Sequence, residues 1–95
     1  MRDGEFEWDD AKAAANLARH GVSFGDARLA FADAFAVESE DLRKDYGGER
    51  RYIWLGMVAN RLLHVAYTMR DERIRVISAR HAEPRERRRY HEQDS

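Results

Sequence analysis

The sequence contains no cysteine, and this absence excludes disulfide bonds, thiolate catalysis and cysteine-ligated metals. It has a single proline and no run that approaches the roughly 18 consecutive apolar residues that span a bilayer. The N-terminal residues are mostly charged and have no apolar signal core behind them. We therefore expect a cytoplasmic protein without a membrane segment, stabilised by the packing of apolar side chains.

Sequence motifs for metals and cofactors are missing as well. The four histidines form no H-x-x-x-H or H-x-x-E-H pattern. Gly47-Gly48 is not followed by the Lys-Ser or Lys-Thr of a phosphate loop, and neither G-x-G-x-x-G nor G-x-S-x-G occurs. These absences predict that the chain uses no metal and no cofactor. They also argue against nucleoside-triphosphate use and serine-hydrolase chemistry.

The chain is short, with 95 residues and a mass of 11.1 kDa, so we expect one domain over residues 1–95 with a single modest core. Hydrophobic residues make up 43% of the composition and charged residues 37%. This is enough apolar material to fold, and the charge is too interrupted for a disordered chain. The composition therefore predicts a globular protein.

The net charge of −1 hides a strong asymmetry along the chain. Residues 1–49 contain six basic and twelve acidic residues, a net charge of −6, whereas residues 50–90 contain eleven arginines and four acidic residues, a net charge of +7. Arginine suits bidentate contacts with phosphate or carboxylate. Two interpretations follow: the second half carries a surface for a polyanion, or the two halves pair with each other.

Capping residues and apolar spacing predict two N-terminal helices. Asp9 is a suitable N-cap for a helix with an alanine-rich apolar stripe, and Gly21 is its stop signal. Ser23 then caps a second helix, whose buried face includes Phe24 and Phe31. By their i, i+4 spacing, Lys12 and Asn16 lie on one face of the first helix, where they could contact RNA or only solvent.

Later segments read as strands, followed by one more helix. Pro84 suits the first turn of a helix that continues through an arginine-rich run to Tyr90. The polar run 40–49 reads as a loop. The predicted strands cover residues 5–8, 34–39, 50–58, 62–69 and 74–79. This order predicts an α+β fold, in which two N-terminal helices and a C-terminal helix pack on an antiparallel-rich sheet of four to five strands.

A hairpin turn at Asp71-Glu72 would give the last two strands a defined register. Arg70 would then face Arg73, Thr68 would face Arg75, and Ala66 would face Ile77. Because successive side chains alternate between the two faces of a sheet, this register separates a cationic face from an apolar face. The cationic face would contain His64, Thr68, Arg70, Arg73 and Arg75, and the apolar face Leu63, Val65, Tyr67, Met69, Ile74 and Val76.

An arginine-dense sheet with a histidine nearby has the groups that a metal-free ribonuclease needs. Such an enzyme requires a base for the 2′-hydroxyl proton, cations for the crowded phosphorane, and an acid for the leaving 5′-oxygen. Histidine suits either proton role because it titrates near pH 6.5. A basic surface that only binds nucleic acid or an acidic protein requires the same residues, so the residues alone leave both functions open.

An ordered set of short motifs allows the sequence to be compared with a known protein family. They are Phe6-Glu7-Trp8-Asp9-Asp10-Ala11-Lys12, Arg19-His20-Gly21-Val22-Ser23-Phe24, Gly48-Glu49-Arg50-Arg51, Tyr67-Thr68-Met69-Arg70, Ile74-Arg75-Val76-Ile77-Ser78-Ala79-Arg80 and Glu86-Arg87-Arg88. In this order and spacing they resemble the BrnT toxin family over residues 6–90. One departure is the segment before the last helix, where this chain has Glu83 and family members often have a Thr or Ser cap.

The resemblance implies a toxin of a bacterial type II toxin–antitoxin pair, with a fold related to the RelE ribonucleases. Such a toxin cleaves RNA without a metal and thereby inhibits translation and growth, and a cognate antitoxin neutralises it. It also implies that the complex contacts operator DNA only through the antitoxin. The alternative is a relative of the same fold that cleaves nothing and only binds an antitoxin or nucleic acid.

The resemblance also implies a reactive set. His20 matches the histidine of the family's HGVSF segment, Arg70 closes its YTxR segment, and Arg80 closes its ISAR segment; Glu86 completes the set. In this hypothesis Arg70 and Arg80 hold the scissile phosphate, while His20 or Glu86 moves a proton. Three of these residues also have a structural interpretation: His20 as a helix cap, and Arg80 and Glu86 as members of ordinary ion pairs.

Three further basic residues are candidates for contacts with the RNA backbone: Lys12, Arg50 and Arg75. Ordinary surface charge is the alternative for each of them. Trp8 and Trp54 are expected in the core rather than on a base-stacking surface.

Overall fold

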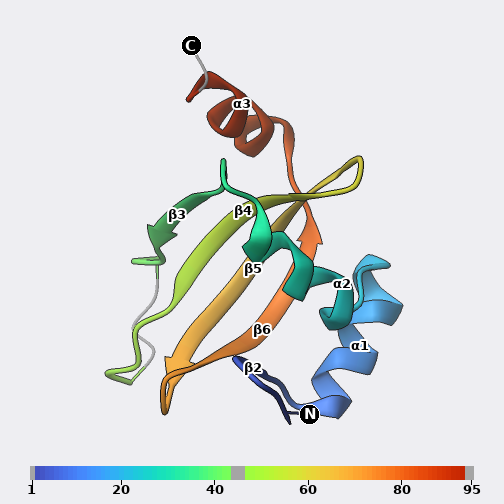
Figure 1. Cartoon of the computed structure of the whole chain (residues 1–95), viewed down its shortest axis with the longest axis vertical. Coiled ribbons are helices and arrows are strands. Elements are labelled where there is room, and N and C mark those ends of the chain that lie inside the picture. Colours follow the sequence, from blue (N-terminus) through green and yellow to red (C-terminus); the bar gives the residue numbers. More distant parts are fainter. Residues whose placement is uncertain (1, 44–46, 94–95) are drawn as a thin grey trace.

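The computed structural model describes residues 2–43 and 47–93 and contains one mixed sheet flanked by helices (Figure 1). The strand order is β1-β2-β6-β5-β4-β3, antiparallel except for the parallel pair β2–β6. The elements are β1 (Arg2–Asp3), β2 (Phe6–Glu7), α1 (Asp10–His20), α2 (Phe24–Leu29), the 3₁₀ helix η1 (Ala30–Ala32), β3 (Val37–Glu40), β4 (Tyr52–Val58), β5 (Arg61–Arg70), β6 (Arg73–His81) and α3 (Pro84–Glu92).

The predicted α+β class and the antiparallel-rich sheet are confirmed, with the two-residue β1 as an additional edge strand. The strand predicted over residues 34–39 begins only at Val37. The preceding residues turn instead, because the Phe35 N–H donates to the Asp33 carboxylate at 2.9 Å and the Ala36 N–H donates to the Asp33 carbonyl at 3.2 Å. Glu40 belongs to β3 rather than to the predicted loop, and residues 44–46 of that loop lie outside the described residues.

Both N-terminal helices begin, and α1 ends, where their capping residues predict, whereas Phe31 of the predicted second helix lies in η1. The Asp9 carboxylate accepts a hydrogen bond from the Lys12 N–H at 3.0 Å, and the Ser23 hydroxyl accepts one from the Asp26 N–H at 3.0 Å. Gly21 ends α1 in the left-handed conformation, with φ of 70°. These local signals set the limits of α1 and the start of α2.

The two faces of the sheet differ in composition, and both are partly covered. On the helical face, α1, α2 and η1 cover a core that includes Phe24, Leu63, Val65 and Val76. On the opposite face, α3 packs at one end of the sheet (top of Figure 1) and forms a second, smaller cluster. Its buried members are Leu55, Leu62, Ala82 and Tyr90. We call this opposite face, defined by His64, Thr68, Arg70, Arg73, Arg75 and Arg80, the arginine face.

The predicted register of the last hairpin is right near the turn and wrong further along. Arg70 faces Arg73 and Thr68 faces Arg75, as predicted. Ala66, however, faces Ser78 and not Ile77, because a β-bulge inserts one extra residue into β6. One extra residue reverses the side-chain alternation beyond it. Arg80 therefore lies on the arginine face, directly opposite His64.

Gly56 allows η1 to approach β4 closely, and replacing it tests this contact. A Cβ at Gly56 would lie 2.5 Å from the Ala30 carbonyl oxygen and 2.8 Å from Trp54 Nε1, two atoms that are hydrogen bonded to each other. We expect Gly56→Ala to lower the free energy of unfolding by about 1–3 kcal/mol, measured by urea denaturation. Gly25→Ala is the control, since its Cβ meets only the Ser23 hydroxyl at 3.8 Å. Equal stability of the two variants would contradict the close approach.

Candidate active site

A bidentate ion pair joins the end of β6 to the first turn of α3. Arg80 Nη1 lies 2.9 Å from Glu86 Oε1, and Nη2 lies 2.9 Å from Oε2. The Glu83 N–H also donates to Glu86 Oε1 at 2.8 Å, so Glu86 caps the helix from within. This backbone contact fixes the Glu86 carboxylate at the start of α3 although Glu83 replaces the expected Thr or Ser. Arg80 and Glu86, two members of the predicted reactive set, thus lie in direct contact.

His64 lies beside this ion pair and was not part of the predicted reactive set. Its Nε2 is 3.7 Å from Glu86 Oε2, which is an electrostatic contact rather than a hydrogen bond. The side chain is 8% exposed, and Nδ1 is buried without a hydrogen-bond partner among the residues that the structure describes. The sequence signal for His64 was its predicted place on the cationic face. The bulge, which the sequence does not reveal, brings Arg80 to it.

A hollow of about 200 Å³ opens beside the histidine, between β3, β4, β5 and α3. His64 and Glu86 line it, together with Ile53 from β4 and Arg89 from α3. Arg43 also contributes, and its guanidinium makes two hydrogen bonds to the buried carboxylate of Asp41, at 2.9 and 3.0 Å. The hollow therefore brings together the His64 imidazole, which can accept a proton, and several charged side chains.

The two titratable groups beside Arg80 have shifted pKa values. Burial and the nearby charge of Arg80 lower the pKa of the His64 imidazole below 6.5. Burial opposes ionisation of Glu86, but hydrogen bonds from Arg80 and from the Glu83 backbone outweigh it and lower the pKa of the Glu86 carboxyl below 4.5. At neutral pH the site therefore holds a neutral histidine, a carboxylate and a guanidinium.

Both pKa shifts predict loss of stability in acid. Because His64 takes up a proton more readily in the unfolded chain, the free energy of unfolding should fall as the pH drops below about 6.5. The contribution of Glu86 is complete above about 4.5 and is lost as the pH falls through its lower folded value. Urea denaturation from pH 7 to pH 3 measures this. His64→Gln should flatten the upper part of the curve and Glu86→Gln the lower part; unchanged slopes would contradict the assignment.

The other two members of the predicted reactive set have no hydrogen bond or ion pair with Arg80 or Glu86 among the described residues. Arg70 is six residues from His64 along β5, which corresponds to about 20 Å, and its Nη2 lies 3.5 Å from a Glu49 carboxylate oxygen. His20 ends α1, in the layer on the helical face. Within the described parts of the chain, no hydrogen bond or ion pair connects His20 with Arg80 or Glu86. The structure thus brings together only one half of the predicted set.

The candidate RNA-contacting residues are distributed over both sides of the sheet. Arg75 lies on the arginine face, and its Nη1 is 2.6 Å from a carboxylate oxygen of the buried Glu7. Arg50 is exposed just before β4. Lys12 is exposed on α1, in the layer on the helical face.

Asn16 lies inside the fold, although it shares a helix face with the exposed Lys12. It is buried, and its amide donates to the Val22 and Ala79 carbonyls at 3.0 and 2.8 Å and accepts from the Ala79 N–H at 3.1 Å. Its role is structural. The prediction for the two tryptophans is confirmed, because Trp8 is buried in the core and Trp54 packs against it.

Two searches of the described residues complete the site. No group of three or more His, Asp or Glu side chains among them is arranged to hold a metal ion. None of their helices is both long enough and apolar enough to cross a membrane.

Fold and site together define a small α+β protein whose sheet carries, on one face, a row of arginines and a buried histidine beside an arginine–glutamate pair. A family model matches residues 8–86 of this chain, that of the ribonuclease toxin BrnT of type II toxin–antitoxin systems. The chain therefore belongs to the BrnT family, and the resemblance in its motifs is confirmed. Membership in a type II family implies an antitoxin as partner. A search of curated proteins finds no match to the chain.

Proposed function

We propose that this chain is a metal-independent endoribonuclease toxin, which cleaves RNA, inhibits translation and growth, and is neutralised by a cognate antitoxin. It acts in the cytoplasm and reaches operator DNA only through the antitoxin complex. The observation that carries the proposal is the contact of Arg80 with Glu86 beside the neutral, buried His64. Family membership supports it.

Arg80 keeps donors for a phosphate despite its ion pair. A guanidinium has five N–H donors, and the contacts of Arg80 with Glu86 and with the His81 carbonyl use three of them. The Nε donor and the second Nη2 donor, which together form one edge of the fork, have no partner among the described residues. That edge can bind two phosphate oxygens while Glu86 holds the adjacent edge, formed by Nη1 and Nη2, in place. Arg80 is thereby preorganised to stabilise the phosphorane.

The proton transfer of the proposed reaction starts at the 2′-hydroxyl. His64, neutral at pH 7, or the Glu86 carboxylate accepts this proton. The 2′-oxygen then forms a bond to phosphorus, the bond to the 5′-oxygen breaks, and the leaving oxygen takes up a proton that the same group returns or that water supplies. The geometry favours these two groups over His20, because they lie beside Arg80. His20 stays the alternative that the family motif supplies.

The remaining arginines supply a path for the RNA backbone. Arg50, Arg70 and Arg75 are proposed contacts along the sheet, and Lys12 is a further candidate on α1. At the other end of the sheet, the site lies against α3, which has four exposed arginines without an ion pair among the described residues: Arg85, Arg87, Arg88 and Arg89. Such charge favours a polyanion without specifying its sequence.

The proposal is tested by inducing the protein in a bacterial host, with and without the adjacent reading frame that would encode the antitoxin, and by following growth and RNA integrity. We expect growth arrest and RNA fragmentation, both suppressed by the adjacent frame, and cleavage by the purified protein in the presence of a chelator. Arg80→Ala should abolish the effects, whereas Arg19→Ala, an exposed arginine of α1, should keep them. Intact RNA with a folded, expressed protein would favour a binding module of the same fold.

A further inference from the structure

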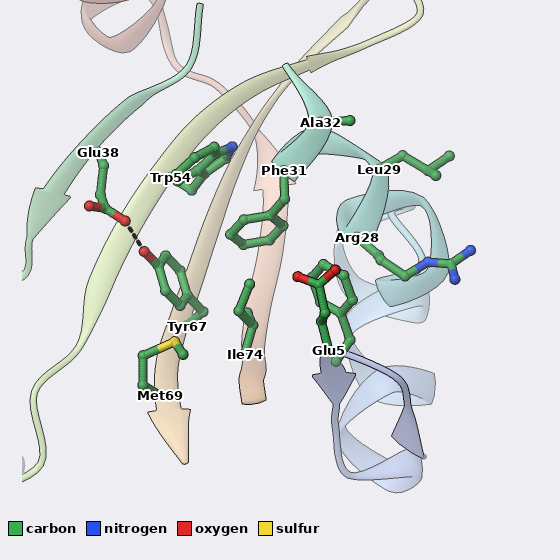
Figure 2. A pocket seen from close by; sticks show the side chains of 11 residues that line it. Glu5, Arg28, Leu29, Phe31, Ala32, Glu38, Trp54, Tyr67, Met69 and Ile74 are labelled. Carbon is green, nitrogen blue, oxygen red and sulfur yellow. Dashed lines mark hydrogen bonds between the residues drawn. The ribbon is translucent and has the colours of Figure 1, made fainter. Parts of the chain in front are cut away.

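A second and larger hollow lies on the helical face, away from Arg80. It encloses about 620 Å³, and Figure 2 shows its aromatic floor between two carboxylates. Its side chains come from β2, β3, β4, β5 and β6 and from the segment of α2 and η1. Nothing in the proposed cleavage reaction uses it.

The hollow exists because the helical layer is incomplete. In Figure 1, α1, α2 and η1 cover one side of the sheet, and none of the described helices crosses the part near the hairpin between β5 and β6. Phe31 of η1 lines the hollow, and its ring packs against Phe6, Trp54 and Tyr67 with centroid distances of 5.4, 4.8 and 5.2 Å. The floor is therefore a packed aromatic surface that exists before any partner binds.

Aliphatic side chains at the margin of this floor are exposed. Met69 is 51% exposed and Leu29 is 50% exposed, and both line the hollow with Ile74 (Figure 2). Single exposed apolar residues are common, but a contiguous apolar surface of this kind usually marks an interaction site.

The charges around the hollow indicate the sign of its partner. Glu5 and Glu38 stand at opposite sides of the floor in Figure 2, and the Glu38 carboxylate is held by a hydrogen bond from the Tyr67 hydroxyl. Arg28 also lines the hollow, so its described lining carries two carboxylates and one guanidinium and is negative on balance. A segment with apolar residues between basic ones would complement both the floor and these carboxylates.

We propose that this hollow binds an amphipathic helix of the antitoxin, with its apolar face on the aromatic floor and basic residues near Glu5 and Glu38. This inference depends on the proposed function only in assigning the partner to the antitoxin. A helix fits better than a strand, since the hollow lies over the face of the sheet, where the strands are already paired with their neighbours. From β2 to β3 the sheet measures about 19 Å, which a helix of about 13 residues crosses.

This placement separates the antitoxin dock from the cleavage site. The floor residues point to the helical face, and Arg80 lies on the arginine face, so substitutions in the hollow should weaken antitoxin binding and leave the cleavage machinery intact. Suppression of toxicity then requires a further part of the antitoxin to reach the arginine face.

The test measures by calorimetry the affinity of the purified chain for the protein encoded by the adjacent reading frame. Leu29→Glu and Met69→Glu should each weaken binding about 30-fold or more, as for central interface residues. Leu17→Glu is the matched control, because Leu17 is also 50% exposed on a helix but lies outside the hollow, and it should stay within about threefold of the parent chain. Glu5→Lys should weaken binding less, and this effect should shrink as salt is added.

Circular dichroism and RNA cleavage by each free variant show that the fold and the site are intact. Unchanged affinity of folded Leu29→Glu and Met69→Glu would overturn the inference, as would absence of any binding to the parent chain. A parent chain that binds, loses affinity through these substitutions and cleaves no RNA would support the dock while refuting the proposed ribonuclease. The two proposals therefore fail independently.

Discussion

Replacing His64 with glutamine is expected to lower the rate of RNA cleavage about 10²- to 10⁴-fold, the usual contribution of a positioned acid or base. Glutamine has a similar size but cannot exchange a proton near neutral pH. The rate is measured under single-turnover conditions with purified protein and a fluorescent RNA, and the pH profile should lose the ionisation that His64 contributes below pH 6.5. Binding of uncleaved RNA should change little, since Arg80 and the arginines of α3 are retained.

Two further histidine variants make this result specific. His81→Gln is the control, because His81 is exposed at the end of β6, only one residue after Arg80, and its loss should leave the rate within about threefold. His20→Gln separates the two assignments of the proton carrier. If it abolishes cleavage while His64→Gln cleaves normally, the family motif identifies the reactive histidine and the geometry around Arg80 does not.

Replacing Asn16 with alanine is expected to lower the free energy of unfolding by about 3–5 kcal/mol, a large part of the stability of a small domain. Beyond the pair of β2 with Ile74 and Arg75, none of the described strands lies along this edge of β6. The amide of Asn16 takes the place of one, with hydrogen bonds to both backbone groups of Ala79 and a third to the Val22 carbonyl. Alanine leaves these buried groups without partners.

Urea denaturation measures the effect, and Leu17→Ala is the control. Leu17 is the next residue on α1 and is 50% exposed, so its replacement should cost less than about 1 kcal/mol. A loss of the same small size for Asn16→Ala would mean that the three hydrogen bonds contribute little to the fold. In that case the side chain would be available for the RNA contact that its spacing from Lys12 suggested.

The sequence determined most of the local structure of this protein. Asp9, Gly21 and Ser23 act through hydrogen bonds and backbone conformations within a few residues, so the limits of α1 and the start of α2 follow from their order. Alternation of apolar and polar residues likewise placed the strands and the first pairs of the last hairpin. The ordered motifs identified the family without any knowledge of three-dimensional contacts.

Only the tertiary structure decided which functional residues meet. The bulge in β6 turns Arg80 toward His64, and α3 brings Glu86 to both of them, while Arg70 stays about 20 Å away along the same strand as His64. The physical reason is that one inserted residue reverses the faces of a strand and that helix packing joins segments distant in sequence. Neither effect leaves a local pattern, and the same is true of Asn16, whose partner Ala79 lies on another element.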